Sequence, residues 1–219
     1  MTQRLLLLIV SCLTSWTLSA QLGSLTSVRL DFTDSGGNTV SATASNSGSG
    51  FVADGSISLS ESTEYTLSVS LLNGSNDITS ELTNNANQYQ LFFGFGEDLF
   101  DRPNGDGNLD NAADPLLYDD MDGNSLPVGL ATNWITACTN DGNATGALRA
   151  ILKYQPGTKT VTSDTSVGTT DFDISWNITV VDNPDASECE NEEEEINEVV
   201  FTFTPAVGGD PVVSISTDP

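Results

Sequence analysis

Hydrophobic and polar residues alternate through most of the chain, and the alternation is most regular between Thr169 and Val181. The apolar side chains of this segment occupy every second position: Phe172, Ile174, Trp176, Ile178 and Val180. Successive side chains of a β-strand point to opposite faces, so the pattern predicts a half-buried strand. Because Trp176 lies near its middle, other strands must cover that face.

The same period of two recurs upstream in short segments that are separated by turn residues. The alternating segments are 28–32, 40–44, 57–59, 65–71 and 148–154. Further strands are expected over residues 89–95, which are more continuously apolar, and over 116–118 and 130–137. Between the first two lies the turn Ser35 to Asn38, where two glycines supply positive φ angles at little cost. Many short alternating strands of this kind predict an all-β fold, an antiparallel β-sandwich that is immunoglobulin-like or similar.

One short helix interrupts the strands. Asp77 is a suitable N-cap for a helix over residues 78–84, and Glu81 in its first turn suits the helix dipole. Ile78 and Leu82 are four residues apart, so they share one face and are expected to close one end of the sandwich.

The first twenty residues have the pattern of a signal peptide. Arg4 precedes an apolar run that begins at Leu5, and Leu18 to Ala20 form a small-residue cleavage site before Gln21. An alternative uses Ile9 to Cys12 as a lipoprotein box, with a lipid on Cys12. Both alternatives predict export, to the periplasm, the outer membrane or the medium. The apolar run is too short and too interrupted to cross a membrane as a helix.

Charge and composition exclude several functions. Six Lys and Arg residues stand against 31 Asp and Glu residues, a net charge of −25, and there is no histidine. Nucleic-acid partners are not expected, since they require basic residues that neutralise phosphates. The absence of histidine argues against a Ser-His-Asp triad and most zinc sites.

The C-terminal part of the chain differs from the rest. Residues 182–195 form an acidic linker, so residues 21–181 are expected to be the β-sandwich domain. Residues 196–219 then repeat its beginning, because Val199 to Thr204 align with Val28 to Thr33. We therefore expect residues 196–219 to be the start of a second, truncated copy. Two strands alone are marginally stable, so this segment is also a candidate for self-association.

Three segments resemble a known family. They are residues 118–130 (YDDMDGNSLPVGL), 147–156 (ALRAILKYQP) and 168–175 (GTTDFDIS). Together they resemble, in order, a Gram-negative exported lipoprotein family labelled type 1 periplasmic binding fold superfamily protein. The resemblance covers residues 25–181 and implies an exported β-rich domain of unknown biochemical role, without catalytic residues to carry over. Family members usually begin with a lipidated cysteine followed by acidic residues, whereas here the similar string starts at Cys189, inside the chain.

An acidic insertion, Asp101 to Asp120, is the best candidate for a metal site. Oxygen-bearing side chains recur at short intervals here, as Ca²⁺ requires; the proposed ligands are Asn104, Asp106, Asn108, Asp110, Asp114 and Asp120. Position 12 of the corresponding EF-hand loop would be Leu117 and position 6 would be Asn111, so this is no standard EF-hand. The alternative is a solvated turn without a metal.

Two cysteines remain after cleavage at Gln21. Cys138 and Cys189 form an even pair, and an oxidising compartment permits a disulfide between them. The alternative is two unrelated thiols, because spacing alone does not establish disulfide geometry.

The sequence predicts a non-catalytic exported or cell-surface module with a structural or ligand-binding role, whose ligand or protein partner it does not identify. Calcium would stabilise the module if the acidic insertion is a metal site. An alternative is a subunit that donates its C-terminal strand to a neighbour's open sheet edge. A carboxylate-dependent hydrolase is a weaker alternative. Asp171 and Asp173 are paired acids, but no isolated acid in an apolar segment suggests a raised pKa.

Overall fold

A computed structural model describes residues 22, 24–110, 116–139, 142–183, 202–203 and 213–214. The chain divides into two compact units, Met1–Asn183 and Pro184–Pro219. The predicted signal peptide, which includes Cys12, lies outside the described residues. So do the acidic linker and the tail, except for residues 182–183 and two short strands.

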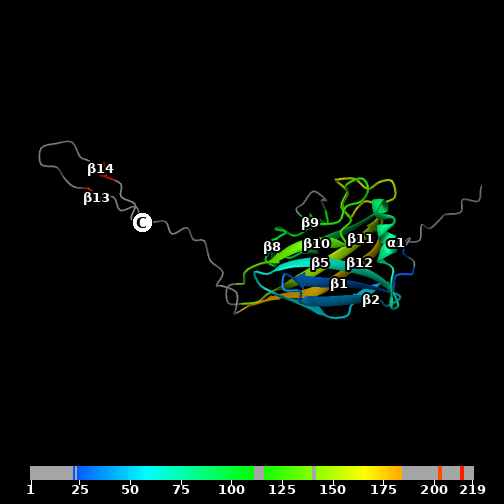
Figure 1. Cartoon of the computed structure of the whole chain (residues 1–219), viewed down its shortest axis with the longest axis horizontal. Coiled ribbons are helices and arrows are strands. Elements are labelled where there is room, and N and C mark those ends of the chain that lie inside the picture. The colour runs from blue at the N-terminus through cyan, green and yellow to red at the C-terminus, as the bar shows by residue number, and fades with distance from the viewer. Residues whose placement is uncertain are drawn as a thin grey trace, which may run out of the picture. The chain divides into compact units, whose positions relative to one another are not determined.

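The first unit is all-β and sandwich-like, as predicted, and contains two sheets (Figure 1). Sheet A has the strand order β3 (Phe51–Ala53), β2 (Thr39–Asn46), β1 (Ser27–Asp34), β5 (Glu64–Asn73), β10 (Ala131–Thr136) and β8 (Phe100–Arg102). Two short strands extend it, with β6 (Asn76–Asp77) pairing β5 and β9 (Leu117–Tyr118) pairing β10. Sheet B has the order β4 (Ser56–Ser60), β12 (Thr169–Val181), β11 (Ala144–Tyr154) and β7 (Tyr89–Phe95).

One pairing departs from the expected antiparallel arrangement. Among the named strands, β4 and β12 run parallel, with Ile57 opposite Ile178 and Leu59 opposite Val180. The chain crosses from sheet A to sheet B between β3 and β4, which brings β4 alongside the last named strand of the unit. A parallel pair needs a long connection, and here more than a hundred residues separate its two strands.

Trp134 lies at the centre of the core. Its ring contacts Phe32 and Phe100 of sheet A and Phe93 and Phe95 of sheet B, with centroid separations between 4.7 and 6.3 Å. The alternating apolar residues of β12 are buried as predicted, and the Trp176 indole N–H donates to the carbonyl of Thr43 at 3.0 Å. Both tryptophans therefore join the two sheets.

The short helix is present as α1 (Thr79–Thr83), followed by a 3-10 turn, η1 (Ala86–Gln88). Leu82 and Ile78 are buried, as their spacing predicted. The N-cap is Ile78, not Asp77, and this prediction was wrong by one residue. The Asp77 carboxylate instead accepts the N–H of Thr79 at 2.8 Å, which fixes the turn just before the helix.

The second unit contains one described hairpin. Its strands β13 (Thr202–Phe203) and β14 (Val213–Ser214) pair antiparallel, with Thr202 opposite Ser214. These strands occupy positions that align in sequence with β1 and β2.

Candidate functional site

Two long loops lie against sheet B and contain most of the predicted site residues. We call residues 103–130 the acidic loop and residues 155–168 the β11–β12 loop. They meet where Thr165 donates its N–H and hydroxyl to the carbonyl of Leu109, at 3.0 and 2.6 Å. The acidic loop lies along the β7 edge of sheet B, which is otherwise the last strand on that side.

The outer edge of β7 is bound by the acidic loop. Three loop backbone groups take part: the carbonyl of Val128 accepts from the Leu91 N–H, the carbonyl of Asp106 accepts from the Phe95 N–H, and the Asn108 N–H donates to the Phe93 carbonyl. An unpaired edge of this kind is a site of unwanted strand pairing. The loop therefore supplies β7 with hydrogen bonds that a neighbouring strand would otherwise make.

Asn108 completes this edge with its side chain. Its amide oxygen accepts the N–H of Phe93 at 2.9 Å, and its amide nitrogen donates to the Tyr118 hydroxyl at 2.6 Å. The Tyr118 hydroxyl in turn donates to the Leu91 carbonyl at 2.9 Å. Asn108 is fully buried, so the structure gives this predicted calcium ligand a role in cross-linking the loop to the sheet.

Glycine allows the acidic loop to approach β7 so closely. A Cβ atom on Gly107 would clash with the carbonyl oxygen of Phe93, and one on Gly129 would lie 2.8 Å from the carbonyl oxygen of Leu91. Both glycines also have positive φ angles, of 99° and 97°, which other residues rarely adopt. These two glycines therefore allow the acidic loop to pack closely on β7.

Asp120 also binds protein backbone. Its two carboxylate oxygens accept the N–H groups of Gly129 and Leu130, at 2.9 and 2.8 Å, which closes the second half of the acidic loop. Asn104, Asp106 and Asp110 are exposed, and Asp114 lies outside the described residues. Within the described part of the chain, no three Asp, Glu or Cys side chains gather closely enough to hold a metal ion.

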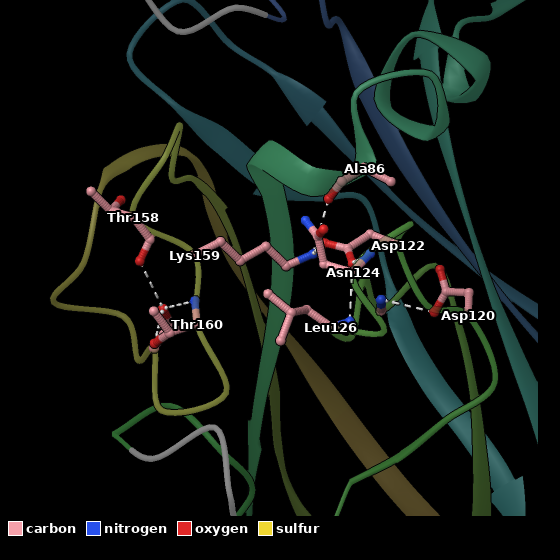
Figure 2. A network of polar contacts seen from close by, with 10 residues as sticks. Ala86, Asp120, Asp122, Asn124, Leu126, Thr158, Lys159 and Thr160 are labelled. Carbon is pink, nitrogen blue, oxygen red and sulfur yellow. Dashed lines mark hydrogen bonds and ion pairs between the residues drawn. The ribbon is translucent and has the colours of Figure 1, made fainter.

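A buried ion pair fastens the two loops together (Figure 2). The Lys159 ammonium lies 2.9 Å from the Asp122 carboxylate, and both side chains are at most 1% exposed. Lys159 also donates to the carbonyl of Ala86 in η1, while Asp122 accepts the N–H groups of Asn124 and Leu126. We call Lys159, Asp122 and the Ala86 carbonyl the lysine latch.

Burial alone would favour the neutral form of the Asp122 carboxyl. The N–H groups of Leu126 and Asn124 and the Lys159 ammonium outweigh that effect and hold the pKa of Asp122 below its usual value. Burial lowers the pKa of Lys159, and the Asp122 carboxylate opposes that change. The sequence gives no sign of this pair, because two residues 37 positions apart leave no local pattern.

Glu61 binds the chain where it leaves β12. Its carboxylate accepts the N–H and hydroxyl of Thr139 and the N–H of Asn183. These bonds, led by the Thr139 hydroxyl, lower the pKa of Glu61 to about 2. Cys138, which precedes Thr139, is disulfide-bonded. Its predicted partner Cys189 lies outside the described residues, so that pairing stays a prediction.

The acids considered for hydrolysis lie in different environments. Asp173 is exposed and pairs with Arg149 at 2.6 Å. Asp171 has two buried carboxylate oxygens without hydrogen-bond partners, and burial raises its pKa to about 6. A general acid must reach its substrate, and these oxygens are shielded from solvent.

A shallow groove of about 460 Å³ adjoins the loops on sheet B. It is lined by Gly94, Phe95, Gly96, Asp106, Leu109, Ala147, Arg149 and Ser175. The guanidinium of Arg149 in this groove is paired with the Asp173 carboxylate. The Asp106 carboxylate also lines the groove and forms no ion pair with the described residues.

No protein-family model, curated protein sequence or solved structure matches this chain. No helix within the described residues is long and apolar enough to cross a membrane.

Proposed function

We propose that the chain is a non-catalytic exported or cell-surface β-sandwich module with a structural or ligand-binding role. The observation that carries this proposal is the way the acidic loop and the β11–β12 loop use their polar side chains. Asn108, Asp120, Asp122 and Lys159 all bind the protein's own backbone or each other. A catalytic loop would instead present such groups to a substrate.

Export can be tested on the full chain with a C-terminal tag in a Gram-negative host. We expect the protein in the periplasm, the outer membrane or the medium, with an amino terminus at Gln21 or a lipid on Cys12. Retention in the cytoplasm with an intact leader would contradict the proposal. Hydrolysis of a glycoside or ester substrate that is lost in Asp171→Asn would favour the hydrolase instead.

Calcium binding is a separate proposal for the exposed side of the acidic loop. Asn104, Asp106 and Asp110 remain accessible there, since the Asn108 and Asp120 side chains bind the sheet edge and the loop backbone. Thermal unfolding with millimolar Ca²⁺ and then with chelator tests it. An upward shift in Tm that Asp106→Ala abolishes would support a calcium site, and no shift would reduce the loop to its packing role.

Assembly by strand donation is a second candidate. Its support is the hairpin of β13 and β14, which repeats the sequence of β1 and β2 and is too short to be stable alone. The hairpin would gain a hydrophobic partner by joining another copy of the first unit.

A further inference from the structure

The lysine latch holds an amine against a carboxyl group in a position shielded from solvent (Figure 2). The Lys159 nitrogen lies 2.9 Å from one oxygen of the Asp122 carboxylate, and neither side chain is more than 1% exposed. The other ion pairs of the described residues are formed by Arg29 and Arg149, whose side chains are 44% and 46% exposed. The latch is therefore the described ion pair that combines a primary amine with the exclusion of water.

The two oxygens of the Asp122 carboxylate have different partners. Oδ1 accepts the N–H groups of Asn124 and Leu126, at 2.8 and 3.0 Å, whereas Oδ2 faces the Lys159 nitrogen. Two backbone donors on one oxygen stabilise negative charge that develops on it, as an oxyanion hole does in acyl transfer. The arrangement therefore favours attack of a nucleophile on the carboxyl carbon of Asp122.

Two hydrogen bonds orient the Lys159 nitrogen for such an attack. It donates to the carbonyl of Ala86 and to Oδ2 of Asp122, each at 2.9 Å. When the proton of the second bond moves to Oδ2, the lone pair left on the nitrogen is directed at the same carboxyl group. Because the fold holds the amine and the acid in contact, their condensation is an intramolecular reaction.

Burial favours the uncharged form of both groups. It is the largest influence on the pKa of Asp122 and of Lys159, although the N–H groups around Asp122 outweigh it there. Proton transfer within the pair removes both charges together, so a desolvated site makes the neutral pair accessible. Asp120 also acts on Lys159, but its carboxylate is bound by the N–H groups of Gly129 and Leu130. The proton transfer is therefore assigned to the pair itself.

We propose that Lys159 and Asp122 form an amide cross-link, an isopeptide bond, between the β11–β12 loop and the acidic loop. A proton moves from Nζ to Oδ2, and the neutral amine attacks Cγ to give a tetrahedral intermediate with its negative charge on Oδ1. The nitrogen then gives a second proton to Oδ2, the Cγ–Oδ2 bond breaks, and one water leaves. An ammonium and a carboxylate thus become one neutral amide and one water, without an oxidant, a reductant or an activating group.

The intact mass of the full chain, measured after denaturation and thiol reduction, tests the proposal. The amino terminus is sequenced first, so that the mass of the unmodified chain is known. We expect the measured mass to be lower by one water. Trypsin should leave the bond after Lys159 uncut and release one cross-linked peptide that contains Lys159 and Asp122. The unmodified mass, with ordinary cleavage after Lys159, would overturn the proposal.

A second reaction also removes one water, because Asp122 precedes Gly123 and an Asp-Gly pair can close to a succinimide. Lys159→Arg separates the two reactions, since it keeps the positive charge and the Asp-Gly pair but removes the amine. This variant should have its unmodified mass. A loss of water that persists in it would indicate the succinimide and overturn the cross-link. Asp173→Ala, which breaks an exposed ion pair, is the matched control and should still lose one water.

The peptide analysis of the unsubstituted chain decides the matter even if a latch variant fails to fold. Either single latch variant and the double variant would lose the same bond, so their effects on stability are not additive. Mass and cleavage pattern do not depend on where the chain is located. Failure of the cross-link and failure of the proposed function are therefore distinguishable.

Discussion

At the scale of single residues, Asn108 has an influence that its polar character does not suggest. One buried amide binds the edge of β7 and the Tyr118 hydroxyl at once. Removing it leaves the Phe93 N–H without its partner, and an unsatisfied buried donor costs about 1–3 kcal/mol.

We expect Asn108→Ala to lower the free energy of unfolding by about 2–4 kcal/mol, from the lost hydrogen bonds and the cavity together. Asn104→Ala is the matched control, because Asn104 is exposed in the same loop and should change stability by less than about 0.5 kcal/mol. Chemical denaturation should give the same loss with Ca²⁺ and with chelator. A loss seen with Ca²⁺ alone would mean that Asn108 acts as a metal ligand.

Asp171 should make stability depend on pH in an unusual direction. Its pKa of about 6 in the folded state is above the ordinary value, so ionisation disfavours folding above pH 6. The folded protein takes up the proton near pH 6, so the penalty falls as the pH decreases from 6 and is gone near pH 4, where the unfolded chain is protonated as well. Asp171→Asn should therefore stabilise the protein at pH 7 by about 1–2 kcal/mol and have a smaller effect at pH 4.

The control for Asp171 is Asp173→Asn, two residues along the same strand. Asp173 is exposed and paired with Arg149, so its replacement should change stability by less than about 1 kcal/mol at either pH. Denaturant melts at pH 7 and pH 4 provide the comparison. Equal stabilisation by Asp171→Asn at both pH values would show that burial of the charge is not the cause.

At the scale of elements, the lysine latch joins parts of the chain that local sequence does not connect. Lys159→Met or Asp122→Asn alone should cost about 3–5 kcal/mol, because each leaves a buried group without its partner. The double variant should lose much less than the sum of the two, since neither charge is then left alone. Additive losses in denaturant unfolding would contradict a direct coupling.

The latch should also protect the edge of β7. Hydrogen exchange at the amides of Leu91 and Phe95 should be faster in Lys159→Met, because the loop that binds them is less firmly held. Amides in the middle of β11, which pairs on both sides, should change only with global stability. An unchanged exchange rate at Leu91 would mean that the acidic loop is held independently of the latch.

The strands were predictable from sequence because their pattern is local. The period of two identified β12 with its bounds and buried face, and the spacing of Ile78 and Leu82 identified α1. The parallel position of β4 could not be predicted, since it depends on which sheet the chain enters after Ala53. The acidic loop suggested metal binding because Asp, Asn and Gly serve both metal-binding and close-packed turns. The structure instead shows Asn108 bonded to Phe93 and Tyr118, which lie 15 and 10 positions away in the sequence. A local pattern does not reveal contacts at that separation.

At the scale of the whole molecule, the proposal of strand donation makes a prediction about oligomeric state. If the hairpin of β13 and β14 joins a second copy, the full chain should form oligomers that depend on concentration. A chain that ends at Glu195 should remain monomeric in sedimentation velocity. The first unit has its own core, so this shorter chain should keep its Tm. Oligomers that survive the deletion would exclude strand donation by the tail.

The position of β12 also determines how the first unit would respond to mechanical force. Near its end, residues 177–180 of this strand are bonded to β11 on one side and to β4 on the other. Tension applied along the strand from Asn183 would load both rows of hydrogen bonds in shear, so many bonds would have to break together. Glu61 binds Asn183 at the point of loading. We therefore expect the first unit to resist force best when it is pulled along β12 through the segment that follows Asn183.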